Sequence, residues 1–370
     1  MNYDFAAYVI QQFRSAEQTI RRRFQQETQG LSKTRAVEEK KRITAEEVSR
    51  FTQRITGGDL RMMDTVLSLI QMSYADYKEG IRQAWMSGAT KSLGPSVQMN
   101  LFAQVLSVER RLSTVLPTLP HYSWYIFLPV RLAEPFTSKD DGEMHVLENP
   151  ICRERVFGVP MVRPSTWKGN LRWMAVMAGL DQEIRERLFG NETHEEEEFR
   201  AGRLFFFPTY FDRIDFEVMT PLDRERRIPK TGPILLECVR HHSDERARPG
   251  EFSLLYLAPT GAWQSPAETA EQAASDLKHT AAILTEMLLF YGFSAKKTGG
   301  FGVIEDNFGD QQGRKLGVLA MVGVALIEVE GMAKSEPAEQ PVTRLPFGSC
   351  AEMRYQAERL ARALKEASHE

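Results

Sequence analysis

The character of the chain changes at residues 122–132, which read YSWYIFLPVRL. Aromatic and β-branched side chains dominate this stretch, and this composition predicts a β-strand. The residues before it show the spacing of helices, whereas strand-like and helical segments alternate after it. We therefore predict an all-helical N-terminal domain at residues 1–116, an α+β domain at 117–345 and a C-terminal helix at 346–370.

The N-terminal domain has a regular apolar pattern in its second half. Met63, Val66, Leu67 and Ile70 follow the i, i+3, i+4, i+7 spacing of one helix face, and Asp59 is a suitable N-cap. A last helix is predicted at residues 97–116, and residues 21–54 are so charged that we expect part of them to be mobile. The domain is either a small helical bundle or a module whose basic face contacts nucleic acid.

The α+β domain contains an early and a late helix with strands around each. Helices are expected at 165–179 and 267–291, and strands at 203–207, 213–219, 234–239, 252–258, near 303 and at 316–329. This order fits a split βαβ sheet of the ferredoxin-like (RRM-like) type. Because that fold serves many unrelated functions, function has to be argued from particular residues.

Composition sets few limits on function. The net charge is -3, but residues 1–116 hold 17 Lys and Arg against 12 Asp and Glu, and four consecutive glutamates occupy 195–198. Basic surface can therefore exist beside clustered acid. The cysteines, Cys152, Cys238 and Cys350, form no CxxC pair and suggest neither a disulfide framework nor a zinc site. No signal peptide or membrane span is evident, so we expect a cytoplasmic protein without a membrane partner.

The first segment with chemical potential is VRPSTWKGNLR at residues 162–172. Ser165 is a candidate N-cap, and a helix N-terminus exposes unpaired amides and the positive end of the helix dipole. Lys168 and Arg172, spaced i, i+4, add two cations on one face. Together with Thr166 they could hold a phosphate, although a capped helix with two solvated cations has the same sequence.

The second segment is GFSAKKTGGFG at residues 292–302, between a predicted helix and a strand. Glycines allow a ligand close to the backbone, and lysines supply charge, so the segment is either a cradle for a phosphate backbone or a plain loop. It lacks the spacing of a P-loop. The candidate phosphate-binding residues here are Lys296, Lys297, Thr298, Gly299, Gly300 and Gly302.

The third segment is a long polar stretch at residues 133–160. Long irregular loops in compact domains are often functional. Asp140, Asp141 and Glu148 could bind Mg²⁺, and His145 could act as a general acid or base. Carboxylates in loops are also commonly just solvated, so both interpretations stay open.

In this order, the segments resemble the RAMP superfamily (repeat-associated mysterious proteins), and most of all the backbone subunits of type III CRISPR effector complexes. Residues 164–172, PSTWKGNLR, are similar to the family pattern G-S-S-x-K-G-x-x-R, with Pro164 in place of the leading glycine. Residues 292–302 correspond to its glycine-rich loop. LENPICRE (147–154) with FGVP (157–160) resembles a loop of target-cleaving subunits, and FEVMTP (216–221) with IPKTG (228–232) resembles mid-chain motifs.

The resemblance covers about residues 122 to 330 and implies a subunit that holds a guide RNA, with target RNA and neighbouring RAMP or other effector subunits as partners. It implies a phosphate grip by the early helix and the glycine-rich loop, with Arg153 as a further RNA-binding residue. Glu148 stands where cleaving relatives carry an aspartate that serves Mg²⁺-dependent RNA cleavage. The chain is therefore either a slow target-RNA endonuclease or a subunit that only binds. In the first case Glu148 is the catalytic residue and metal ligand, and Asp140 and Asp141 are the fallback catalytic carboxylates.

Other functions stay open at this stage. A metal-free guide-processing endoribonuclease would share the fold and the glycine-rich loop, and would use His121 or His145 as general acid or base. A ferredoxin-like protein without an RNA role is the third alternative. The helical N-terminal domain is similar in size to the small helical subunits of type III complexes, so we expect either a fusion with such a subunit or an extension that packs on a neighbour.

Overall fold

The computed structural model describes the chain in two compact units, each built from separate stretches of sequence. One unit comprises residues 1–95, 137–161 and 211–239, and the other comprises 96–136, 162–210 and 240–370. The described residues are 4–90, 107–140, 142, 144–191, 199–220, 223, 228, 233–240, 248–259, 265–324 and 341–367. Asp141, the glutamates at 195–198, most of 228–232 and the first part of the helix predicted at 97–116 lie outside them.

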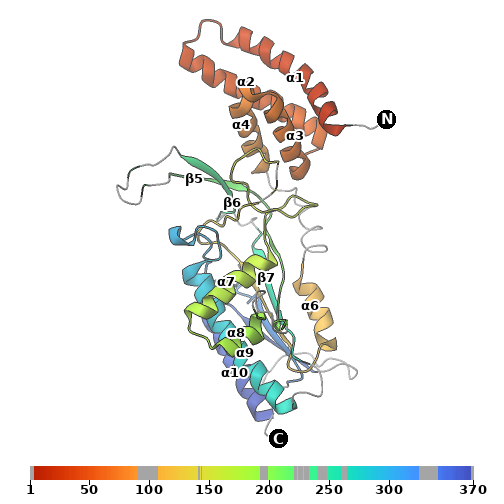
Figure 1. Cartoon of the computed structure of the whole chain (residues 1–370), viewed down its shortest axis with the longest axis vertical. Helices are drawn as coiled ribbons and strands as arrows, with labels where there is room; N and C mark the ends of the chain where they lie inside the picture. The colour runs from red at the N-terminus through yellow and green to blue at the C-terminus, as the bar shows by residue number, and fades with distance from the viewer. Residues whose placement is uncertain are drawn as a thin grey trace. The chain divides into compact units, whose positions relative to one another are not determined.

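The described residues of the first unit form four α-helices, drawn in red to orange in Figure 1. They are α1 (Phe5–Glu27), α2 (Lys33–Thr56), α3 (Leu60–Ser73) and α4 (Lys78–Ala89), with a 3-10 turn at Ala75–Tyr77. Asp59 caps α3 as predicted, because its carboxylate accepts a hydrogen bond from the amide of Met62 at 2.8 Å. Val66, Leu67 and Ile70 are fully buried, as their spacing indicated.

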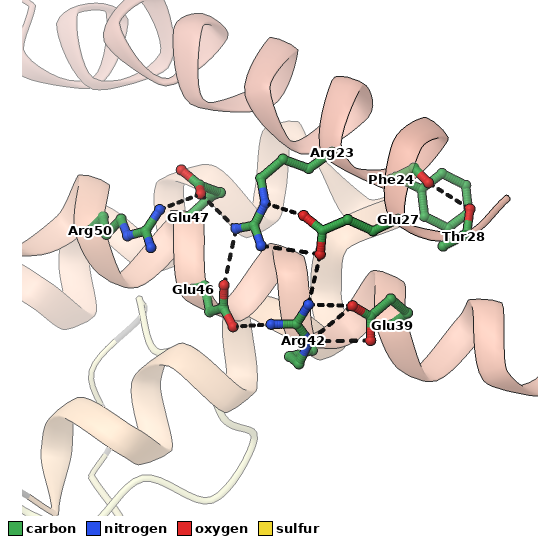
Figure 2. A network of polar contacts seen from close by, with 9 residues as sticks. All are labelled: Arg23, Phe24, Glu27, Thr28, Glu39, Arg42, Glu46, Glu47 and Arg50. Carbon is green, nitrogen blue, oxygen red and sulfur yellow. Dashed lines mark hydrogen bonds and ion pairs between the residues drawn. The ribbon is translucent and has the colours of Figure 1, made fainter.

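The charged region predicted to be partly mobile forms the hairpin of α1 and α2 instead. Figure 2 shows the ion-pair network that joins the two helices. Arg23 of α1 bonds Glu27 at 2.7 Å, Glu46 at 3.0 Å and Glu47 at 2.8 Å. Arg42 of α2 reaches Glu27 at 2.8 Å. Opposite charges at helical spacing and across the hairpin thus compensate for the scarcity of large apolar residues.

Two later segments complete the first unit, so the boundaries differ from the linear ones expected from the sequence. Residues 211–239 supply the antiparallel strands β5 (Asp215–Met219) and β6 (Ile234–Cys238), with Asp215 opposite Cys238. Residues 137–161 are largely irregular, and Thr137 donates to the carbonyl of Glu237 at 2.9 Å. Side chains far apart in sequence therefore form one core.

The second unit is built on a five-stranded antiparallel sheet with the order β3-β7-β1-β8-β9. The strands are β1 (Trp124–Val130), β3 (Leu204–Phe206), β7 (Gly250–Tyr256), β8 (Gly317–Val322) and β9 (Val342–Phe347). The central strand β1 is nearly fully buried, and Trp124 stacks on its register partner Tyr256 at 4.8 Å. Residues 122–132, which were predicted to form a strand, thus contain the central strand of the sheet.

Within the described ranges, the helices of this unit are α6 (Glu109–Val115), α7 (Pro164–Met177), α8 (Gln182–Phe189), α9 (Pro266–Glu286) and α10 (Cys350–Ala367). A capping box between Ser265 and Glu268 starts α9, and a π-turn at Met287–Tyr291 extends it. The order β1-α7-β3-β7-α9-β8, with β3-β7-β1-β8 as neighbours, is that of a ferredoxin-like sheet. The predicted α+β fold, in which N-terminal helices precede a ferredoxin-like core in the sequence, is confirmed.

Smaller features complete the description. The strands β2 (Met161–Val162) and β4 (Thr209–Tyr210) form a separate two-stranded sheet, and Leu116–Thr118 forms a 3-10 turn after α6. Helices α9 and α10 lie side by side, as Figure 1 shows in cyan and blue. None of the helices within the described ranges has a stretch apolar and long enough for a bilayer.

Candidate nucleic-acid interface

The early helix, α7, starts one residue before the predicted N-cap. Pro164 occupies the first helical position, which suits its fixed φ, and Arg163 is the N-cap with φ -67° and ψ 147°. Ser165 as N-cap is therefore wrong. The amides of Thr166 and Trp167 both donate to the carbonyl of Arg163, at 3.0 and 3.2 Å. Since Pro164 has no N–H, few amides remain for an anion, and any phosphate site here depends mainly on side chains.

One side of α7 is fixed in the core of its unit. Trp167 and Leu171 are fully buried. The indole N–H of Trp167 donates to the hydroxyl of Thr209 at 3.1 Å, and its ring lies 4.8 Å from that of Phe252 and 4.3 Å from that of Phe293. These contacts set the rotation of the helix, and hence the side on which Lys168 and Arg172 lie.

The glycines of the 292–302 loop have different roles. Gly292 and Gly302 have φ of +71° and +81°, and a Cβ on Gly302 would lie 2.6 Å from the amide nitrogen of Ser294. The amide of Phe293 donates to the carbonyl of Gly302 at 3.1 Å, so these glycines let the two ends of the loop cross closely. Gly300, with φ +84°, ends the 3-10 turn Lys297–Gly299 and has open space around it.

The helix and the loop meet at Asn170. Its side-chain amide donates to the carbonyl of Phe293 at 3.3 Å, and its Oδ1 accepts from Nζ of Lys297 at 2.9 Å. The same Nζ lies 4.1 Å from the ring centroid of Trp173, and burial lowers the pKa of Lys297. Two segments over a hundred residues apart are thus joined through polar contacts. Asn170 was missed as a candidate, although it lies within the PSTWKGNLR motif.

Ser165 and Gly169 form an exposed strip along α7. The cations of α7 lie on one side of this strip, and those of the loop lie on the other. At about 100° per residue, Lys168 and Arg172 are on the flank of α7 away from Asn170 and the loop. Ser165 and Gly169 fall between the two flanks, and both are exposed. A Cβ on Gly169 would meet nothing within 4 Å, so packing inside the chain does not require a glycine there. Because Ser165 and Gly169 have small side chains, a ligand can approach the helix backbone at this strip.

The two candidate carboxylates that the structure describes, Glu148 and Asp140, each have other partners. Glu148 forms ion pairs with Arg82 and, at 3.4 Å, with Lys78, both from α4. Burial alone would raise the pKa of Glu148, but its own backbone amide and the charge of Arg82 lower it on balance. Asp140 accepts a hydrogen bond from the amide of Gly142 at 3.2 Å. Across the described ranges, no three His, Cys, Asp or Glu side chains are grouped to hold a metal.

Arg153 is buried in the first unit rather than on a surface. Its guanidinium donates to Asp64 and to Glu237, each at 2.8 Å, and lies 4.9 Å from the ring centroid of Trp85. Both carboxylates neutralise it, so its position does not suit a phosphate contact, and the predicted RNA-binding role is not retained.

The two histidines considered for catalysis are placed differently. Nδ1 of His145 lies 2.7 Å from Oδ2 of Asp64, and its side chain is only 15% exposed. His121 is exposed, beside Gly323. No contact of either residue favours the endoribonuclease alternative.

Comparison with known proteins identifies the family. The model of the RAMP superfamily matches residues 56–305. Among solved structures, the chain is similar to one in the cryo-EM structure of type III-B Cmr-beta bound to cognate target RNA, at 15% identity and a TM-score of 0.43, over 64% of this chain and 73% of that one. No curated protein matches. The family model matches more than half of the 370 residues of this protein, and the chain therefore belongs to the RAMP superfamily.

Proposed function

We propose that the protein is a guide-RNA-binding subunit of a type III CRISPR effector complex, with α7 and the 292–302 loop gripping the sugar-phosphate backbone. The junction of Asn170 with Lys297 and Phe293 is the observation that carries this proposal. The contact between α7 and the loop supports the idea that their cations serve one ligand. A ligand held by both has to be an extended polyanion rather than a single phosphate.

The charges of this surface suit a nucleic-acid backbone. Among the described residues, neither Lys168 nor Lys296 forms an ion pair with a carboxylate. Such cations remain available for phosphates, whose counterions are released on binding. The strip offers no arrangement of amide side chains that would read base edges, so binding should follow the backbone and depend little on guide sequence.

The proposed partners are the guide RNA, a target RNA paired with it, and neighbouring subunits of the effector, including other RAMP proteins. The type III assignment is supported by the motifs at 147–160, 164–172 and 292–302. We propose binding rather than cleavage, because Glu148 is already paired with two cations. No catalytic step is assigned to Mg²⁺ for the same reason.

The test is RNA affinity measured over a range of salt concentrations. The double variant Lys168→Ala/Arg172→Ala should bind single-stranded RNA about 10- to 100-fold more weakly, whatever the sequence. Its salt slope should fall by about 0.7 for each phosphate that the variant no longer neutralises. Lys278→Ala, which removes an exposed lysine of α9, is the matched control and should bind like the natural protein. Equal affinity and equal slope for both variants would reject the proposed grip.

A further inference from the structure

Large aromatic side chains are exposed directly beside the proposed grip. Trp173 of α7 is 38% exposed, and Phe290 and Tyr291, from the π-turn after α9, are 68% and 40% exposed. The rings of Trp173 and Tyr291 lie 5.5 Å apart, edge to face. Folding generally buries such rings, and here the other large aromatics of α7 and of the loop, Trp167, Phe293 and Phe301, are buried.

Positive charge accompanies these exposed rings. Lys297 lies over the ring of Trp173, and Lys296 precedes it in the same loop. An apolar protein partner that covered the rings would also bury these cations, which costs free energy unless carboxylates accompany it. A polyanion that carries flat aromatic groups meets both requirements at once. Single-stranded nucleic acid has that chemistry, with phosphates for the cations and bases for the rings.

We infer that Trp173 and Tyr291 form a stacking platform for a nucleobase of the strand held by α7 and the loop. The inference rests on the proposed function, since the phosphates must run along the strip for a base to reach the rings. The edge-to-face contact with Tyr291 and the cation of Lys297 hold the indole in place before RNA arrives. Every base has a flat π-face, so the platform accepts any sequence.

The experiment separates bases from phosphates. Affinity is measured for a single-stranded RNA and for an abasic ribose-phosphate strand of the same length. Trp173→Ala should weaken binding of the RNA about 5- to 100-fold and leave binding of the abasic strand unchanged, whereas Trp173→Phe should retain most of the affinity. Tyr355→Ala is the matched control, because Tyr355 is an exposed aromatic of α10 with Arg359 placed 6.0 Å from its ring centroid.

Each outcome has a distinct meaning. If Trp173→Ala binds RNA as the natural protein does while Lys168→Ala/Arg172→Ala binds weakly, the platform is rejected and the grip stands. The same holds if Trp173→Ala changes only self-association, because the rings would then be a protein contact. If the natural protein binds neither strand, the proposed function itself fails. Circular dichroism of the variants excludes misfolding as the cause of a loss.

Discussion

At the scale of single residues, the strongest constraint in the first unit is a buried set of charges. Arg153 joins Asp64 of α3 to Glu237 of β6, and the indole N–H of Trp85 donates to Glu237 at 2.7 Å. Burial alone would raise the pKa of Asp64, but His145 and Arg153 lower it on balance, whereas the pKa of Glu237 is raised by its burial. One cation thus compensates two carboxylates that lie on different segments.

Removal of that cation should therefore destabilise the protein. Arg153→Met leaves the buried Glu237 without a counterion and Asp64 with His145 alone, and we expect a loss of about 3–5 kcal/mol in the free energy of unfolding. Denaturant titration followed by circular dichroism measures it. Arg155→Met, two residues away and exposed, is the control and should unfold like the natural protein. An Arg153→Met protein of unchanged stability that has lost affinity for RNA would instead restore the RNA-binding role.

The sequence could identify Arg153 as a cation in a polar loop, but it could not predict which carboxylates pair with it. Asp64 and Glu237 are 89 and 84 residues away, and no local pattern links them to it. Lys168 and Arg172 were easier to place, because spacing of i, i+4 on a helix is enough to put two residues on one face. Asn170 and Trp173 were overlooked because their importance depends on the loop that folds against α7.

At the scale of elements, local patterns predicted most helices and most strands of the five-stranded sheet, including its edge strand β3, but missed the other edge strand, β9. The capped helix α3 and the buried strand β1 have strong periodic or compositional signals. The strand β9 was missed, because Pro346 has no N–H to donate to a neighbouring strand and so weakens the strand pattern of this edge strand. The order of the α1–α2 hairpin was underestimated, since ion pairs stabilise it and these leave no apolar periodicity in the sequence.

The ion pairs of this hairpin should contribute unequally to its stability. The side chain of Arg23 is 22% exposed and that of Arg42 is 47% exposed, although each contacts three carboxylates (Figure 2). Arg23→Ala should lower the melting temperature more than Arg42→Ala, with a loss on the order of 1 kcal/mol for Arg23→Ala. Differential scanning calorimetry of both variants at low ionic strength tests this order.

Salt provides the control for the same pair of variants. At 1 M NaCl the Debye length falls to about 3 Å, so an exposed pair contributes little. The difference between Arg42→Ala and the natural protein should then disappear, while part of the difference for Arg23→Ala persists. If both differences survive high salt unchanged, the arginines stabilise the hairpin by packing rather than by charge.

At the scale of the whole molecule, the chain passes between its two units several times. The predicted domain boundary at residue 116 followed a change from helical spacing to a composition typical of strands. Such a change marks where helices end, but it does not show which segments share a core. The described residues of the additions at 137–161 and 211–239 are irregular or strand-like and form no helix. The buried contacts of Asp64 and Trp85 explain why these segments belong there.

This discontinuity predicts that residues 1–116 do not form a stable domain alone. The fragment would lack Arg153 and Glu237, so Asp64 would lose its counterion and Trp85, fully buried in the complete chain, would lose a hydrogen-bond partner and part of its cover. Trp85 is the only tryptophan of the fragment, so its fluorescence reports this site without interference. We expect emission shifted to the red of a buried indole, weak cooperativity in thermal unfolding and rapid proteolysis, with helical content partly retained. Emission typical of a buried indole, together with a cooperative transition as sharp as that of the full chain, would instead show an autonomous helical domain and revive the idea of a fused small subunit.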